Sequence, residues 1–560
     1  MPHGPFSRYR RAGVSEHPPI GDRSDSALYR STIDKRLTAT RLTVVGAAGA
    51  VAAVAFLAIR LQPEVGTKPY FEDEAVAGLI AGRPLPEVIH TVLWERGGSP
   101  LHFVLAHFVL SVWPSVGALR WLSVACALGA VACAYALGRE LAGDLAGSVA
   151  AWIVATSALL HVYGTFGRMY SLLALVGGLN MLLFLRALDR PTQVRVSLAA
   201  MSAWLLAAAH PFGGIPVAVE AVIAACLWWP RRDVRRAIPV LVAGAATLPL
   251  AVAELRLALR FDVSASNGTA LGSGGSAGTQ LASAARGFAG GGSILFWLFL
   301  VLALVGGAVV ARRSLLLAIA GAAALLLPPL LSLVAHVQDT ATAFLSARHL
   351  MQSLPLWAAL IGAGTMRVAA WRPARGVVPL AAAVAVALLA VVTPASARDP
   401  RTHFVFLAQA GDVHTSAAVG DWLEQRIAPG DLLFPYSIPY LRALKASRHA
   451  RSLPRGQART LVASVGDVHD AKRLWIAVPL GANETPLPAV LRSLRQSDVV
   501  QVFPRWLIVG ARPPLSGERQ ILRSLVATVD ATAAAIPRSD TVHQYQDVAR
   551  QALARDSPTR

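Results

Sequence analysis

The chain has little charge, few cysteines and almost no lysine. Charged residues make up 15% of its 560 residues, whereas soluble domains usually contain about a quarter. The three cysteines all lie within apolar runs. They therefore offer no disulfide framework to a domain outside the membrane, and we expect small buried thiols. Residues 1–41 are polar, rich in arginine and without the early apolar segment of a cleavable signal peptide. We predict that they form a disordered basic tail.

Apolar sequence is what the chain has in excess. Hydrophobic residues make up 54% of it, and its mean hydropathy is +0.51. Apolar runs of about 17–22 residues match the length needed to cross roughly 30 Å of hydrocarbon. The predicted fold class is an α-helical polytopic membrane protein with about eleven transmembrane helices within residues 42–394. The expected spans are 42–61, 118–138, 145–163, 169–187, 195–210, 213–229, 237–256, 293–311, 314–335, 350–369 and 376–394.

The net charge of +20 is distributed as membrane orientation requires. Arginines gather in alternate short loops, and such loops face the cytoplasm. Neither a basic helix nor an aromatic–basic patch accompanies the charge, so nucleic acid is not an expected partner. The N-terminus is then cytoplasmic, and the protein is a multi-pass membrane protein. The excess of Arg and Ala over Lys indicates a bacterial source and hence the bacterial plasma (inner) membrane. The segments expected outside are the first outer loop (62–117), the 164–168 turn, the 257–292 and 336–349 loops, and everything after about 395.

The composition changes near residue 395, where apolar runs shorten to strand length. Leu432–Pro435, Leu474–Val478 and Trp506–Val509 are such runs, and helical patterns lie between them. We predict an extracytoplasmic α/β domain over 395–538 and a polar tail over 539–560. This domain contains no recognisable catalytic motif, so it either binds an acceptor or stabilises the fold.

Three consecutive carboxylates, Glu72, Asp73 and Glu74, follow the first span. They could simply be a solvated turn or the start of a helix, where the helix dipole stabilises acidic side chains. A carboxylate at the outer membrane surface can also act as a general base towards a substrate hydroxyl, or bind a divalent cation. Spacing alone leaves these interpretations open.

Two outer segments carry arginine and histidine. Arg168 and Tyr170 follow the turn between two spans, and Arg348 and His349 close a later loop. Arg168 could be a snorkelling side chain or a phosphate clamp, because the guanidinium fork matches phosphate oxygens. The histidine spacing does not indicate a metal site. His161, His210 and the intramembrane Glu220 are interpreted as hydrogen-bonded structural residues, although an isolated intramembrane carboxylate is also a functional candidate.

Several short motifs together resemble the C-type (GT-C) polytopic glycosyltransferases, in particular the group of protein mannosyltransferases and aminoarabinose transferases. The family has an Asp-Glu pair in its first outer loop, then a Pro-Leu segment, and later Arg-containing helix starts. Here the His and Tyr that flank Pro-Leu in the family are absent. The matching segments are Asp73–Ala75, Gly98–His102, Ala118–Ser123, Arg168–Leu172 and Arg348–Pro355.

The resemblance implies an inverting transfer from a polyprenyl-phosphate sugar to an acceptor hydroxyl. Asp73 would be the base and Glu74 would support it, while Arg168, Tyr170 and Arg348 would bind the donor phosphate. Supporting positions would be Glu72, His102 and His349. The sugar, hexose or pentose, stays open, as does the acceptor: a glycan, a protein or a lipid. Some family members need a divalent metal and others do not, so the metal also stays open.

Two other functions are compatible with the sequence. A transporter or lipid flippase would favour paired ionisable residues at the membrane midplane, and Glu220 and the break at Pro211 are the features that fit it. A non-catalytic cell-envelope assembly protein would work through residues 395–560. A glycosyltransferase would turn over a polyprenyl-phosphate sugar in a reaction that depends on Asp73. Neither a transporter nor an assembly protein would do so.

Overall fold

The computed structural model describes most of the membrane region and parts of the C-terminal region. The described ranges are 23–67, 72–96, 99–113, 116–228, 234–260, 287–288, 293–337, 347–370, 377–392, 431–434, 450–452, 470–471, 473–480, 499–503, 506–511, 515–516 and 518–536, with single residues or pairs between 419 and 554. The 257–292 and 336–349 loops lie largely outside them, as does much of 395–538.

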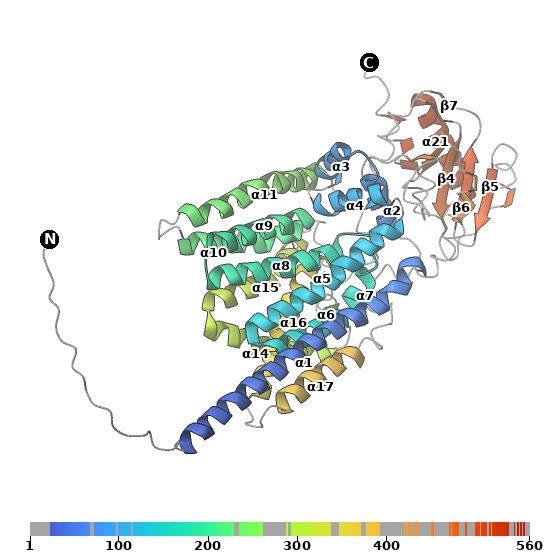
Figure 1. Ribbon diagram of the computed structural model, residues 1–560. Coiled ribbons are helices and arrows are strands. Elements are labelled where there is room, and N and C mark those ends of the chain that lie inside the picture. The colour runs from blue at the N-terminus through green and yellow to red at the C-terminus, as the bar shows by residue number, and fades with distance from the viewer. Residues whose placement is uncertain are drawn as a thin grey trace, which may run out of the picture.

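The membrane region is a bundle of helices (Figure 1). Every expected span falls on a helix, the third on α6 and α7 together. Within the described ranges, four helical stretches are long and apolar enough to cross a bilayer: Thr40–Val65, Gly117–Ala142, Tyr170–Asp189 and Ile294–Arg313. The chain is therefore a polytopic membrane protein, and the count of eleven spans stays a prediction. The helices are α1 (Arg23–Thr67), α5 (Val116–Ala142), α6 (Asp144–Ala155), α7 (Ala158–Tyr163), α8 (Tyr170–Asp189), α9 (Gln193–Ala209), α10 (Gly214–Trp228), α11 (Val234–Arg260), α14 (Ser293–Arg313), α15 (Leu315–Val337), α16 (Leu354–Ala369) and α17 (Val377–Val392).

Helix α1 begins earlier than the sequence pattern suggested. Residues 23–41, expected to be part of a disordered tail, are helical. No glycine or proline interrupts the chain between Arg23 and Thr43, and a polar segment free of these residues can extend an apolar helix outwards. Residues 1–22 lie outside the described part.

Small residues let the helices approach closely. A side chain on Gly306 of α14 would collide with the backbone of Leu360 in α16, and one on Gly364 with the backbone of Leu302. Gly362 meets the backbone of Ala146 in the same way. Helix packing within a membrane depends on such contacts, because lipid tails are as apolar as leucine and provide no hydrophobic drive.

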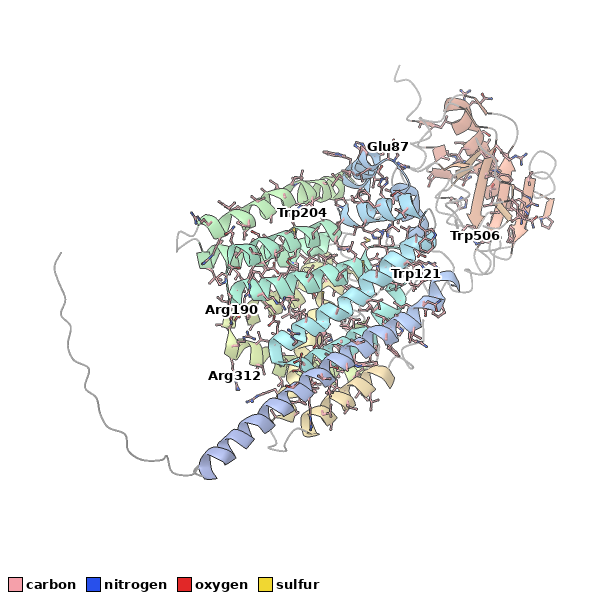
Figure 2. The ribbon with its side chains drawn as sticks, viewed as in Figure 1. Glu87, Trp121, Arg190, Trp204, Arg312 and Trp506 are labelled. Atoms are coloured by element: carbon pink, nitrogen blue, oxygen red, sulfur yellow. The ribbon has the colours of Figure 1, made fainter. Side chains whose placement is uncertain are left out.

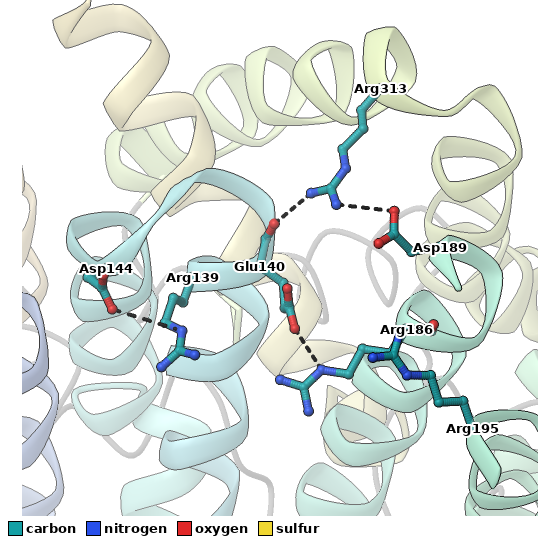
Figure 3. Close-up of polar contacts among 7 residues, drawn as sticks. All are labelled: Arg139, Glu140, Asp144, Arg186, Asp189, Arg195 and Arg313. Carbon is teal, nitrogen blue, oxygen red and sulfur yellow. Dashed lines mark hydrogen bonds and ion pairs between the residues drawn. The ribbon is translucent and has the colours of Figure 1, made fainter. Parts of the chain in front are cut away.

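One end of the bundle is held by a polar network (Figure 3). Arg186 Nε donates to Glu140 Oε1 at 2.6 Å, and Arg313 donates to the Glu140 carbonyl at 2.8 Å and to Asp189 at 3.4 Å. Arg195 donates to the Arg186 carbonyl at 3.4 Å. These contacts join α5, α8, α9 and α14. Arg139 and Asp144 form a longer pair nearby, 3.9 Å apart.

The arginine-rich loops and the first outer loop lie at opposite ends of the bundle. Figure 2 shows Arg190 and Arg312 at one end and Glu87 and Trp121 at the other. This segregation is what the charge pattern predicted. Which end faces the cytoplasm stays a prediction.

The first outer loop folds into short helices over the second end. They are α2 (Glu72–Ala81), α3 (Leu85–Thr91), a π-helical turn (Val92–Arg96) and α4 (Leu101–Val112). At 1.5 Å per residue, the twelve residues of α4 are too short to cross the hydrocarbon. Trp94 and Trp113 are exposed, as expected of interfacial anchors.

The C-terminal region contains a mixed five-stranded sheet in the order β2-β1-β4-β6-β5. The strands β1, β4 and β6 coincide with the three expected runs, and that 395–538 form a separate domain stays a prediction. The buried residues of this sheet and of α21 form one cluster with Ala77, Val88 and Phe103 of the outer-loop helices. The element bounds are β1 (Asp431–Phe434), β2 (Ala450–Ser452), β3 (Asp470–Ala471), β4 (Leu474–Pro479), β5 (Val499–Phe503), β6 (Trp506–Ala511), β7 (Leu515–Ser516) and α21 (Glu518–Ala535).

The polar tail expected after 538 is also partly structured. Residues 543, 546–547, 549–550 and 553–554 are helical, and Ala549 is fully buried. Its apolar contacts explain the difference, because alanines spaced along a polar helix can still cover a core cluster.

Candidate functional site

The acidic triplet opens helix α2, and the structure resolves the surroundings of its last member. Glu74 is fully buried, with 0% of its surface exposed. The side chains of Glu72 and Asp73 lie outside the described part of the chain.

Glu74 forms a two-point ion pair with Arg120 of α5. Arg120 Nε donates to Oε1 and Nη2 to Oε2, both at 2.9 Å. Arg120 is 1% exposed and also donates from Nη1 to the carbonyl of Val65 at 3.1 Å. A buried pair persists when its remaining polar atoms are satisfied. This one joins the end of α1, the start of α2 and the start of α5.

A third contact ties Glu74 to the 164–169 turn. The backbone N–H of Gly167 donates to Glu74 Oε1 at 2.8 Å. On the other side of the turn, Ser123 Oγ donates to the Phe166 carbonyl at 2.6 Å. Gly167 packs so tightly that an added Cβ would lie 3.2 Å from Glu74 Oε1. The turn is thereby held against α2 and α5, with Arg168 next to the anchored residue.

His102, at the start of α4, lies next to the same turn. It is 1% exposed, and the backbone of Gly167 is near enough to its ring to oppose the lowering of its pKa. Burial, together with the nearby Arg168 guanidinium, lowers the pKa of His102 to about 3. Arg168 lies 5.8 Å from the centre of the Phe103 ring. The imidazole is therefore neutral at physiological pH.

Arg348 and His349 reach this end of the bundle from the segment before α16. Arg348 lies 5.6 Å from the centre of the Tyr170 ring and donates from Nε to His349 Nε2 at 3.3 Å. The His349 ring stacks on those of His210, at 5.4 Å, and Phe212, at 5.7 Å. The predicted residues Tyr170, Arg348 and His349 are thus neighbours in space.

His210 is within electrostatic reach of both arginines. Burial, the charge of Arg348 and that of Arg168, in that order, lower the pKa of His210 to about 3. Its Nδ1 accepts a hydrogen bond from the Phe212 N–H at 3.2 Å. A neutral imidazole carries one proton, so the proton is on Nε2 and this nitrogen is a donor.

The arrangement is suited to an anion that carries an apolar chain. Two guanidinium groups and an imidazole N–H offer donors to oxygen atoms, and guanidinium–phosphate hydrogen bonds are among the strongest in proteins. Aromatic rings surround them: Tyr163, Phe166 and Tyr170 pack with centroid distances of 4.8–6.0 Å. The helix bundle below supplies apolar surface.

No group of three or more metal-binding side chains occurs within the described residues. Because the side chains of Glu72 and Asp73 are not among them, the metal stays open.

Sequence reasoning missed three participants. Arg120 appeared only as part of a span-opening motif, and Gly167 had no assigned role. His210 was interpreted as a hydrogen-bonded interfacial residue, which is correct for its Nδ1, but its position beside Arg348 was not foreseen. In a single sequence no signal pairs these residues, because they are far apart along the chain.

Glu220 has the structural partner expected of it. Asn180 Nδ2 donates to Glu220 Oε1 at 2.6 Å, and Ser202 Oγ donates to Asn180 Oδ1 at 3.0 Å. This buried network joins α8, α9 and α10. It satisfies an intramembrane carboxyl by hydrogen bonding alone.

The fold is similar to that of ArnT from Cupriavidus metallidurans in two crystal structures. The apo structure has a TM-score of 0.52 and 13% sequence identity, covering 83% of this chain and 98% of that one. The structure bound to undecaprenyl phosphate has a TM-score of 0.51 and 14% identity, covering 85% and 100%. The predicted resemblance to the GT-C group is therefore confirmed at the level of fold. No protein-family model matches the chain, and no curated protein sequence matches it.

Proposed function

We propose that the chain is a membrane glycosyltransferase that uses a polyprenyl-phosphate sugar as donor. The observation that carries the proposal is that Arg168 and Arg348, 180 residues apart, both act electrostatically on the buried imidazole of His210. The ring of His349, which accepts from Arg348, stacks on that imidazole at 5.4 Å. Two cations held beside aromatic rings at a helix-bundle end suit a phosphate whose lipid chain enters the membrane. The shared fold with a protein crystallised with undecaprenyl phosphate supports this assignment.

In the proposed reaction, Arg168, Arg348 and the Nε2–H of His210 hold the donor phosphate. They stabilise the negative charge that grows as polyprenyl phosphate leaves, an electrostatic effect that is often the largest in catalysis. Tyr170 and His349 position Arg348 through the contacts described above.

Asp73 is the proposed base. It would accept the proton of the acceptor hydroxyl as that oxygen attacks the anomeric carbon with inversion. Its neighbour Glu74 is occupied by Arg120 and Gly167. We therefore assign Glu74 a positioning role, holding the start of α2 next to Arg168, in agreement with its expected support of the base.

Binding of decaprenyl phosphate to the full chain in lipid nanodiscs tests the phosphate site. Replacement of either Arg168 or Arg348 by Ala is expected to raise the Kd at least tenfold, because charge-assisted hydrogen bonds contribute about 1.5–3 kcal/mol. Arg312→Ala, at the opposite end of the bundle (Figure 2), is the matched control and should leave the Kd unchanged. Equal affinity of wild type and both site variants would overturn the assignment.

A further inference from the structure

His102 contains a buried nitrogen without a hydrogen-bond partner in the described part of the chain. Its Nε2 has no hydrogen-bond partner among the described residues, although the side chain is 1% exposed. A buried polar atom without a partner costs free energy. Such an atom close to Arg168 is suited to a polar group of a bound ligand.

The protonation state of His102 restricts that group. The Gly167 backbone opposes the lowering of the His102 pKa, as a nearby carbonyl does by favouring a protonated ring nitrogen. Since Nε2 has no partner within the described residues, we assign the proton of the ring to Nδ1. The imidazole is neutral, and Nε2 therefore presents a lone pair. It can accept from a hydroxyl or an amine, and it cannot donate to a phosphate oxygen.

Ser99 provides a second such atom. Its Oγ is buried and also lacks a partner within the described segments. Ser99 precedes α4 by two residues, and Pro100 at the N-cap offers no side-chain hydrogen bond to the helix. Two unused polar atoms thus lie three residues apart in one segment.

Arg168 connects this segment with the phosphate site. Its charge lowers the pKa of both His102 and His210, so it lies within electrostatic reach of both imidazoles. A sugar ring attached to a phosphate between Arg168, Arg348 and His210 would be close to Arg168. Its hydroxyl groups can then reach towards His102.

We propose that His102 Nε2 accepts a hydrogen bond from a substrate hydroxyl, with Ser99 Oγ as a second hydrogen-bonding group of the same subsite. The inference rests on the proposed function and extends it, because it assigns sugar recognition to the start of α4. The hydroxyl belongs either to the donor sugar or to the acceptor.

Two substitutions separate the ring nitrogens of His102. In His102→Asn the amide N–H occupies the place of Nδ1 and keeps a donor there, but the acceptor at Nε2 is lost. In His102→Gln the amide oxygen reaches the place of Nε2 and keeps the acceptor. His107→Asn is a control in the same helix, because His107 already bonds with the Ala81 carbonyl at 2.9 Å.

The test uses the full chain in nanodiscs with decaprenyl phosphate and with a panel of decaprenyl-phosphate hexoses and pentoses. For a donor hydroxyl, His102→Asn raises the Kd of the sugar-bearing lipid about tenfold, as expected for one lost hydrogen bond. The Kd of bare decaprenyl phosphate is unchanged, and His102→Gln stays within about threefold of wild type. Ser99→Ala acts in the same direction.

For an acceptor hydroxyl, both Kd values stay at the wild-type level in His102→Asn. The KM for an added cell-envelope extract then rises, while kcat stays similar.

The proposal is overturned if His102→Asn matches wild type in all three measurements. It is also overturned if His102→Gln is as impaired as His102→Asn. A third contrary result is that His102→Asn weakens the binding of bare decaprenyl phosphate as much as that of the sugar-bearing lipid. These results leave the phosphate site intact when wild type binds decaprenyl phosphate. If wild type does not bind it, the proposed function fails as well.

Discussion

Glu74 and Arg120, 46 residues apart in the chain, form a fully buried ion pair joined by two hydrogen bonds of 2.9 Å. The pair sits where the ends of α1, α2 and α5 meet, and the turn that carries Arg168 is attached to it through Gly167. A structural ion pair thus lies beside the residues proposed for catalysis.

Breaking this pair should destabilise the protein strongly. Glu74→Gln leaves a buried guanidinium without its counter-ion, which costs about 3–5 kcal/mol, and should lower the thermal unfolding midpoint in detergent. The double variant Glu74→Leu/Arg120→Met should recover part of the loss, since an apolar replacement removes both charges. The control is Asp189→Asn, whose partner Arg313 is half-exposed. It should change stability by less than about 1 kcal/mol, and an equal loss in both would contradict the assignment.

Asp73→Asn should abolish sugar transfer while the protein still inserts and folds. A general base contributes about 10²–10⁴-fold to rate, so release of polyprenyl phosphate from the donor should fall by at least two orders of magnitude. Glu87→Gln is the matched control, because Glu87 is an exposed carboxylate in the same outer loop. Full activity of Asp73→Asn would remove Asp73 from the mechanism.

Stability should fall as the pH drops below about 6.5, the usual histidine value. The pKa of His102 and that of His210 are both lowered to about 3 in the folded protein, with Arg168 facing both and Arg348 facing His210. Between these values the unfolded chain binds protons that the folded chain does not, so stability rises with pH there.

This loss of stability at low pH is large enough to measure by thermal unfolding. Each histidine should cost about 1.4 kcal/mol between pH 7.5 and 5.5. Unfolding midpoints of wild type and of His210→Asn, which keeps an acceptor for the Phe212 N–H, should differ less at pH 5.5 than at pH 7.5. Parallel pH profiles would show that His210 is not held neutral.

Adjacent glycines in α14 should respond oppositely to alanine. A Cβ at Gly306 collides with the backbone of Leu360, whereas one at Gly307 meets nothing within 4 Å. Gly306→Ala should therefore destabilise the α14–α16 contact by about 1–3 kcal/mol. Gly307→Ala should be neutral or slightly stabilising, because alanine favours helix. Equal unfolding midpoints for the two variants would contradict the close approach of these helices.

Local features of the chain were accessible from the sequence. The length of each apolar run located every described helix of the membrane region, since a hydrocarbon-facing helix needs a continuous apolar stretch. Arg168, Tyr170, Arg348 and His349 were selected from their motifs at the ends of apolar runs, and the structure brings Tyr170, Arg348 and His349 together. That they form the site stays a prediction. The early start of α1 and the helical residues after 538 were missed, as their polar sequence lacks that signal.

The sequence by itself determined a polytopic helical protein, the segregation of arginine to alternate loops, and a carboxylate-bearing outer loop. Only the tertiary structure decided that Glu74 pairs with Arg120, and that both Arg168 and Arg348 act on His210. The physical reason is that hydrophobicity specifies each helix locally. Which helix ends meet depends on close packing at small residues spread over the whole bundle, and the pairing of single charges follows from that packing.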